Sequence, residues 1–326
     1  MAEDHVNQAL SDDALFSFVQ PSAQSAQQLH TPGDSYWRGV WRMFCRKKSN
    51  LFLLFFLGVL LIFTYLYPTV IGYDAQTDPY IHLLDPTAKH LRPAAAMEKF
   101  GSNIHWILDT GASGQSTFDA VWYGARISVS LALVCAAINL TVGVLVGAVW
   151  GFSKKVDLFM TELYNICSNV PYILIVSVVV LILSSGFFSM VFALTVTGWL
   201  SIAWFIRTQV ILLRDREYNL ASRCLGTPIV RMAVRNILPY MTSVIVTLAA
   251  AEIPSYISYE VFLSYIGLGL QDMSLGRLIE ASQSAMFTPG WELEFWSPVA
   301  VASVITVVLY VVGQNLGDAA DPRTHL

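Results

Sequence analysis

Long apolar runs without a charged side chain constrain this chain more than any other feature. A helix needs about 20 apolar residues to cross the hydrocarbon core of a bilayer. No Asp, Glu, Lys or Arg occurs in four stretches, residues 51–73, 127–153, 163–206 and 295–317. Only 13% of the 326 residues are charged, against about 25% in ordinary soluble domains. This pattern excludes a soluble globular enzyme, a disordered chain and a coiled coil, and it predicts a membrane protein.

Six spans follow from these runs. The stretch 163–206 is long enough for two helices, and Ser184, Ser185 and Gly186 mark a turn near its middle. Another span is apolar apart from Glu252 and Glu260. We therefore predict an all-α polytopic membrane protein with six transmembrane helices, at residues 51–71, 127–151, 159–183, 187–211, 240–266 and 296–316.

The remaining residues form tails and loops around these helices. We predict a cytoplasmic N-terminal tail with a basic flank at 1–50 and a small extracytoplasmic insertion at 72–126, which looks helical near 94–100. A five-helix core at 127–316 contains a cytoplasmic loop at 214–239. A short cytoplasmic tail at 317–326 ends the chain.

The distribution of Lys and Arg sets the orientation of this bundle. Cytoplasmic loops carry an excess of both residues. With both termini in the cytoplasm, 14 of the 19 basic residues lie inside, and the inverted topology would place those 14 outside. We predict a multi-pass protein of the cell membrane whose four cysteines are cytoplasmic or intramembrane, which also argues against a disulfide framework.

The loop between the fourth and fifth spans carries an ordered series of helix signals. Ala221 and Ser222 are small, which allows another surface to approach closely. Gly226 can end a helix in the left-handed conformation, and Thr227 followed by Pro228 can cap and begin the next helix. We predict two short helices that meet at a sharp corner at Gly226. A plain basic loop would explain the arginines here but not this order of residues.

This order resembles the coupling loop of permeases of ATP-binding-cassette (ABC) importers. That motif has two alanines, a glycine four residues after the second, and a Leu-Pro pair whose proline lies thirteen residues after the glycine, which matches Leu238 and Pro239 here. In the family the loop, whose helix begins near Glu217 in this chain, docks into a groove of the ATPase subunit. Ser222 departs from the usual alanine, and Asn236 stands where an apolar residue or histidine is more usual.

Other segments resemble the C-type permeases of peptide and nickel importers. They are residues 123–128, 260–270 and 317–323, so the resemblance covers most of residues 100–326. The C-terminal segment is shorter than usual in the family. The acidic and basic cluster that usually precedes the second span is replaced by residues 114–120.

The resemblance implies a transport subunit rather than an enzyme. It implies alternating access driven by two cytoplasmic ATPase subunits, together with a homologous second permease and an extracytoplasmic substrate-binding protein. ATP and Mg²⁺ are expected on the ATPase subunits, and this chain has no phosphate-binding glycine loop of its own. We expect no cofactor, catalytic residue or nucleic-acid partner in this chain.

Three alternatives remain open at this point. A nickel-importing permease of the same family fits the same motifs, because substrate choice in such systems rests largely with the binding protein. A stand-alone secondary transporter would use Glu252 and Glu260 as a proton site and would show internal repeats, and none is evident. A membrane enzyme would need a nucleophile and base or a metal pair within the spans, where no histidine occurs.

Two features within the spans have both a structural and a functional interpretation. Gly143, Gly147 and Gly151 lie on one helix face and favour close helix packing, either within this bundle or against a second permease. Glu252 and Glu260 either line the translocation path or form structural hydrogen bonds. In the path, Glu260 would stay ionised and contact the cationic end of a peptide. A structural role would instead have it satisfied by Ser258, by Tyr256 or by the partner permease. The three histidines of the outer segment, His82, His90 and His105, do not have the spacing of a metal site.

Overall fold

The computed structural model describes residues 36–73, 85–184 and 186–321. Residues 1–39 and 40–326 form two separate units, and of the first only residues 36–39 are described, at the start of helix α2 (Tyr36–Arg46). Most of the predicted N-terminal tail therefore lies outside the described residues, as do residues 74–84 of the predicted insertion and the last five residues of the chain.

Helices make up all the regular elements of the described ranges. The long or apolar ones are α3 (Lys48–Val70), α5 (Thr117–Phe152), α6 (Lys154–Ser168), α7 (Tyr172–Leu183), α8 (Phe187–Thr195), α9 (Trp199–Arg214), α12 (Thr242–Tyr265) and α14 (Glu292–Ala320). Five helices are long and apolar enough to cross a membrane, and the bent pair α6–α7 raises the number to six if it is one span. The predicted all-α multi-pass fold is confirmed.

Helix α5 begins earlier than the apolar run suggests, at Thr117 rather than Ile127. The Ser116 side chain accepts a hydrogen bond from the backbone N–H of Asp119 at 3.1 Å and caps the helix. Serine is a favoured N-cap residue because it satisfies a free backbone donor. The last part of the predicted insertion is therefore the first part of this helix.

The third span is not a continuous helix, contrary to the prediction. Helices α6 and α7 meet at an angle of 80°, because Pro171 cannot donate a backbone hydrogen bond and stands as the N-cap of α7. The fourth span, Phe187–Arg214, is one candidate span with a short break, since α8 ends at Thr195 and α9 begins at Trp199. Both breaks lie within the charge-free stretch 163–206.

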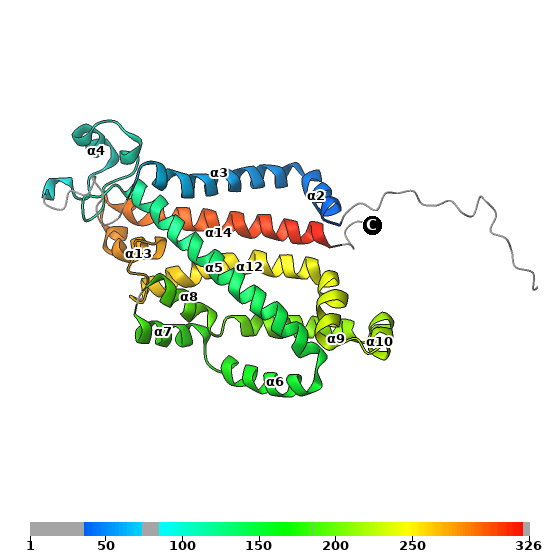
Figure 1. Ribbon diagram of the computed structural model, residues 1–326. Helices are drawn as coiled ribbons and strands as arrows, with labels where there is room; N and C mark the ends of the chain where they lie inside the picture. The colour runs from blue at the N-terminus through cyan, green and yellow to red at the C-terminus, as the bar shows by residue number, and fades with distance from the viewer. Residues whose placement is uncertain (1–35, 74–84, 185, 322–326) are drawn as a thin grey trace, which may run out of the picture. The chain divides into compact units, whose positions relative to one another are not determined.

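Helix α5 lies at the centre of the bundle. It packs against α9, α12 and α3, while α14 packs against both α12 and α3 (Figure 1). The main apolar core forms where α5, α7, α8 and α12 meet, around fully buried side chains such as Leu131, Leu194 and Ile257.

Short helices lie at both ends of the bundle. Between α3 and α5 are η1 (Pro86–Ala88), α4 (Pro93–Phe100) and η2 (Ile104–Trp106), and α4 is the predicted helical stretch. Helix α13 (Leu275–Ala281) and η5 (Gln283–Phe287) lie between α12 and α14. At the opposite end of the bundle is the predicted loop at 214–239, where α10 (Glu217–Cys224) lies (Figure 1).

Candidate functional site

Gly226 forms the predicted corner after α10. Its φ of +75° lies in the left-handed region, and no other atom lies within 4 Å of where a Cβ would stand. The backbone N–H of Gly226 donates to the carbonyl of Arg223 at 2.9 Å, and that of Thr227 donates to the carbonyl of Ser222 at 3.1 Å. These two bonds are the Schellman pattern, which satisfies the free carbonyls at a helix end. Glu217, Ala221 and Ser222 all lie in α10, as expected.

The chain after the corner differs from the predicted single helix. Thr227 does not cap it, since Pro228 is the N-cap residue of α11 (Ile229–Met232) and no side chain caps that helix. A π-turn, η3 (Ala233–Ile237), and a 3-10 turn, η4 (Leu238–Met241), follow. Pro239 in η4 explains the irregularity, because a proline ring clashes with the carbonyl four residues earlier and interrupts the α-helical ladder.

Ser222 and Asn236, the two departures from the family motif, contact each other. The Asn236 side-chain amide donates to the Ser222 hydroxyl at 3.2 Å and to Asn219 Oδ1 at 3.4 Å. Asn219 is fully buried and donates to the carbonyl of Leu213 at 3.0 Å. These polar contacts join α10 to the end of α9 and to the π-turn, so the corner is held from both sides.

The corner exposes apolar side chains among charged ones. Leu225 is 86% exposed at the end of α10, Tyr218 and Leu220 are also exposed, and so are Glu217 and Arg223. None of the three apolar residues belongs to a segment that could span the membrane. Tyr218 and Leu225 are seven residues apart and therefore lie on one helix face, where they can contact another molecule.

The three glycines of α5 face α9 of the same chain. A Cβ at Gly147 would lie 2.5 Å from the carbonyl oxygen of Ala203, and one at Gly151 would lie 2.6 Å from Val210 Cβ. A Cβ at Gly143 would lie 2.7 Å from the side chain of Ile202. The glycine face of α5 is therefore packed within this bundle, which is one of the two interpretations of the glycine spacing. Because α9 covers this face, it is not open to a second permease.

Glu260 lies in a closed nest of serines. The carboxylate is fully buried and accepts hydrogen bonds from Ser128 Oγ at 2.8 Å, Ser264 Oγ at 2.9 Å and Ser274 Oγ at 2.5 Å. The expected partner Ser258 instead donates to the carbonyl of Pro254. Ser274 is also the N-cap of α13, and Ser128 accepts from the backbone N–H of Leu275. Glu260 thus ties α13 to α5 and α12.

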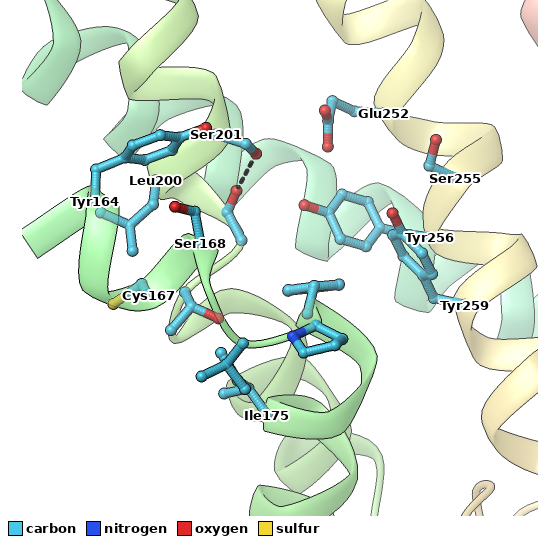
Figure 2. A pocket seen from close by; sticks show the side chains of 15 residues that line it. Tyr164, Cys167, Ser168, Ile175, Leu200, Ser201, Glu252, Ser255, Tyr256 and Tyr259 are labelled. Atoms are coloured by element: carbon cyan, nitrogen blue, oxygen red, sulfur yellow. Dashed lines mark hydrogen bonds between the residues drawn. The ribbon is translucent and has the colours of Figure 1, made fainter.

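Glu252 has different surroundings from Glu260, although both lie on α12. It lines a cavity of about 330 Å³ together with residues from α6, α7, α9 and the break between α8 and α9. Figure 2 shows Glu252, Ser255, Tyr256 and Tyr259 on α12, across the cavity from Ser168 and Ser201. The sequence groups the two glutamates together, but the structure separates them. Glu252 lines a cavity, and Glu260 is enclosed by hydrogen-bonding serines.

The segment before α5 contains a polar cluster that the sequence does not indicate. His90 Nδ1 lies 2.9 Å from Glu294 Oε2, and the His90 ring stacks on Trp291 at a centroid distance of 3.7 Å. The buried Asp109 lies near Glu294, and burial raises the pKa of Asp109 to about 7. No local pattern signals contacts between residues so far apart in the chain. Within the described ranges no group of three or more His, Cys, Asp or Glu residues could hold a metal.

The comparisons with known proteins agree with this architecture. Residues 140–326 match the family described as the inner membrane component of binding-protein-dependent transport systems, and residues 35–86 match the N-terminal transmembrane domain of oligopeptide transport permease C. The oligopeptide transport system permease protein AmiD of Streptococcus pneumoniae is 40% identical over 96% of this chain and 98% of its own length. The dipeptide transport system permease protein DppC of Bacillus subtilis is 29% identical over 95% of this chain and 93% of its own length.

The family match covers more than half of the chain and extends from within α5 to the C-terminus. It includes the corner at Gly226, Glu260 with its partners Ser264 and Ser274, and the residues that line the cavity beside Glu252. The chain is therefore a multi-pass membrane protein that belongs to the family of inner membrane components of binding-protein-dependent transport systems.

Proposed function

We propose that this chain is the permease subunit of an ABC importer that carries oligopeptides or dipeptides into the cell. The observation that carries the proposal is its 40% identity, over nearly its whole length, with a permease named for oligopeptide transport. The other similar relatives are also named for peptide transport, which favours peptides over nickel as the cargo. The subunit works with a homologous permease, two ATPase subunits and an extracytoplasmic binding protein, and ATP and Mg²⁺ bind to the ATPases.

The corner around Gly226 is proposed as the contact with the ATPase. The exposed side chains of Tyr218 and Leu225 support this role, because α10 lies at one end of the bundle and outside the spanning segments. The contacts of Asn219 and Asn236 would pass a displacement of α10 on to α9 and α12. By the positive-inside rule this end is cytoplasmic, and the segment between α3 and α5 is on the opposite side.

Substitution of Leu225 by Glu tests this coupling. Because Leu225 is 86% exposed, the change costs little in folding, and it places a charge within the proposed apolar contact. We expect the variant to reach the membrane at the normal level, to retain less ATPase on purification and to lose most uptake of labelled peptide.

Phe287→Glu is the matched control. Phe287 is 83% exposed and lies outside the spanning segments, between α12 and α14. It should retain the ATPase subunits. Normal ATPase retention and normal uptake in Leu225→Glu would refute the coupling assignment, and lack of peptide uptake by the parent complex would refute the peptide cargo.

A further inference from the structure

Irregular backbone from the third span and from the fourth span lines one cavity. Val170 and Pro171 from the break between α6 and α7, and Thr197 and Gly198 from the break between α8 and α9, line the same space of about 330 Å³. At membrane depth, non-helical backbone is tolerated only where it is buried in protein or lines a water-filled cavity. The convergence of both breaks therefore indicates a polar cavity built into the bundle.

Glu252 places this cavity near mid-depth in the membrane. Helix α12 starts at Thr242, so Glu252 lies about 15 Å along it at about 1.5 Å per residue. The hydrocarbon core is about 30 Å thick. Ionisable side chains at such depth are costly and mark substrate or ion pathways.

The cavity has an acidic side chain and no basic one among the described residues that line it. Among those described residues, Glu252 is the one acidic residue and there is no Lys, Arg or His. Among the ion pairs of the described residues, none includes Glu252. A carboxylate away from bulk water is stabilised strongly by a cation, so the cavity favours a positively charged ligand.

Tyrosine rings add to this preference. Tyr256 and Tyr259 follow Glu252 on the same face of α12, and Tyr172 of α7 lies 5.1 Å from Tyr259 between ring centroids. Asn139 Nδ2 donates to the Tyr256 hydroxyl at 2.6 Å, and the Tyr172 hydroxyl donates to the carbonyl of Leu194 at 2.7 Å. These bonds hold the rings in place. Aromatic faces attract cations, and most strongly where water is excluded.

The polar atoms of the lining suit an ammonium group. An ammonium has three N–H donors and no acceptor, so it requires several oxygen acceptors at once. The carboxylate of Glu252 and the hydroxyl of Ser255 lie on α12, and Thr197 Oγ1 is a buried atom without a hydrogen-bond partner in the described part of the chain. A hard metal ion would need a fuller set of oxygen ligands, which this carboxylate with its aromatic neighbours does not supply.

We propose that this cavity binds the protonated α-amino group of a peptide during its passage through the membrane. The ammonium group pairs with Glu252 and lies against the rings of Tyr256 and Tyr259. That the ammonium group comes from a peptide rests on the proposed function. The preference of the cavity for an ammonium cation does not.

Cys167 provides a native reporter, because it lines the same cavity. In the assembled transporter with Cys45, Cys135 and Cys224 replaced, Cys167 is treated with the cationic 2-aminoethyl methanethiosulfonate or with its neutral methyl analogue. The ratio of the two reaction rates measures the preference of the cavity for an ammonium group. We expect Glu252→Gln to lower this ratio about tenfold, since it removes the nearby charge, and Glu252→Asp to preserve it.

Glu162→Gln is the matched control. Glu162 is exposed on α6, the helix that carries Cys167, and does not line the cavity. An unchanged ratio in Glu252→Gln, or an equal fall in Glu162→Gln, would overturn the proposal. If Glu252→Gln does not assemble, Ser255→Lys places an ammonium group in the cavity instead and should lower the same ratio. An unchanged ratio in that variant would also overturn the proposal.

A second experiment, with added peptide, distinguishes this proposal from the proposed function. A peptide with a free amino terminus should slow the reaction of Cys167 with the neutral reagent, and the same peptide acetylated at its amino terminus should protect much less. Equal protection by both peptides would overturn the assignment to the α-amino group. If the parent complex takes up no peptide and yet shows the Glu252-dependent rate ratio, the cation preference stands and the peptide cargo fails.

Discussion

The carboxylate of Glu260 receives three serine hydroxyls from three parts of the chain. Ser128 belongs to α5, Ser264 to α12, and Ser274 caps α13. Each of these contacts is charge-assisted if the carboxylate is ionised, and such hydrogen bonds are roughly twice as strong as neutral ones. The geometry favours a structural role for Glu260 over a place in the translocation path.

Glu260→Gln tests this role. The amide replaces one acceptor oxygen with a donor that meets hydroxyl donors, and a buried mismatch of this kind costs about 1–3 kcal/mol. We expect a lower melting temperature of the purified complex and an equal fall in the uptake of cationic and neutral peptides. Ser258→Ala is the control, because that hydroxyl bonds only to a carbonyl of its own helix. A selective loss of cationic peptides would instead assign Glu260 to the path.

The contact between Ser222 and Asn236 shows two unusual residues that compensate each other. An alanine at 222 would remove the hydroxyl that accepts the Asn236 amide at 3.2 Å. An apolar residue at 236 would leave Ser222 with its bond to the carbonyl of Tyr218 alone among the side-chain bonds described. The two residues that depart from the family motif are therefore joined to each other by a hydrogen bond.

At the scale of elements, the segment between α3 and α5 is held to the start of α14 by the polar cluster at Glu294. Besides its contact with His90, Glu294 accepts a hydrogen bond from the backbone N–H of Ala112 at 2.9 Å. Asp109 adjoins this cluster and is only 2% exposed. Burial, together with the charge of Glu294, raises the pKa of Asp109 from 3.8 to about 7.

This shift predicts that the folded protein loses stability as the pH rises. The pKa is higher in the folded state, so between about pH 4 and pH 7 the folded state binds the proton more strongly. The stability therefore falls across this window and stays low above it. We expect Asp109→Asn to remove the fall and to stabilise the complex at pH 8 by a few kcal/mol, since each pKa unit is worth about 1.4 kcal/mol.

Thermal melting of the purified complex at pH 5 and pH 8 measures this effect. Asp272→Asn serves as the control, because Asp272 is an exposed carboxylate beyond the end of α12. The asparagine at 109 should raise the melting temperature at pH 8 and change it little at pH 5. A gain of the same size at both values would mean that the ionisation of Asp109 is not the cause.

The sequence predicts the helices well where the signal is local. Apolar runs locate the spans, and Gly226 is recognised as a corner because few other residues adopt its φ. The break at Pro171 lies within a stretch without charged residues that reads as one span, although the proline itself was a signal of the break. The serine partners of Glu260 and the pairing of His90 with Glu294 could not be predicted, because they join residues that are far apart in the chain and depend on how the helices pack.

For the whole molecule, the orientation in the membrane is the property that joins the proposed sites. The distribution of Lys and Arg predicts that α10 is in the cytoplasm and α4 on the other side. These elements lie at opposite ends of the bundle (Figure 1). The ATPase and the binding protein would then reach the same chain from opposite sides.

Thiol labelling in intact cells tests the orientation. Cys224 is exposed on α10, and Ser102 is exposed just after α4. In single-cysteine variants, a membrane-impermeant maleimide should label Ser102→Cys without permeabilisation and Cys224 only after it. Labelling of Cys224 in intact cells would contradict the predicted topology and indicate the inverted one.

The breaks in the third and fourth spans also bear on how a cell must produce this protein. Each break interrupts the helical hydrogen-bond ladder at a depth where lipid tails offer no substitute. In the proposed assembly, a copy without its companion subunit would leave this irregular backbone less protected from lipid, which is costly. Surplus copies would be short-lived, so the abundance of the mature transporter would follow its scarcest subunit, and balanced synthesis would matter more than strong expression of any one gene.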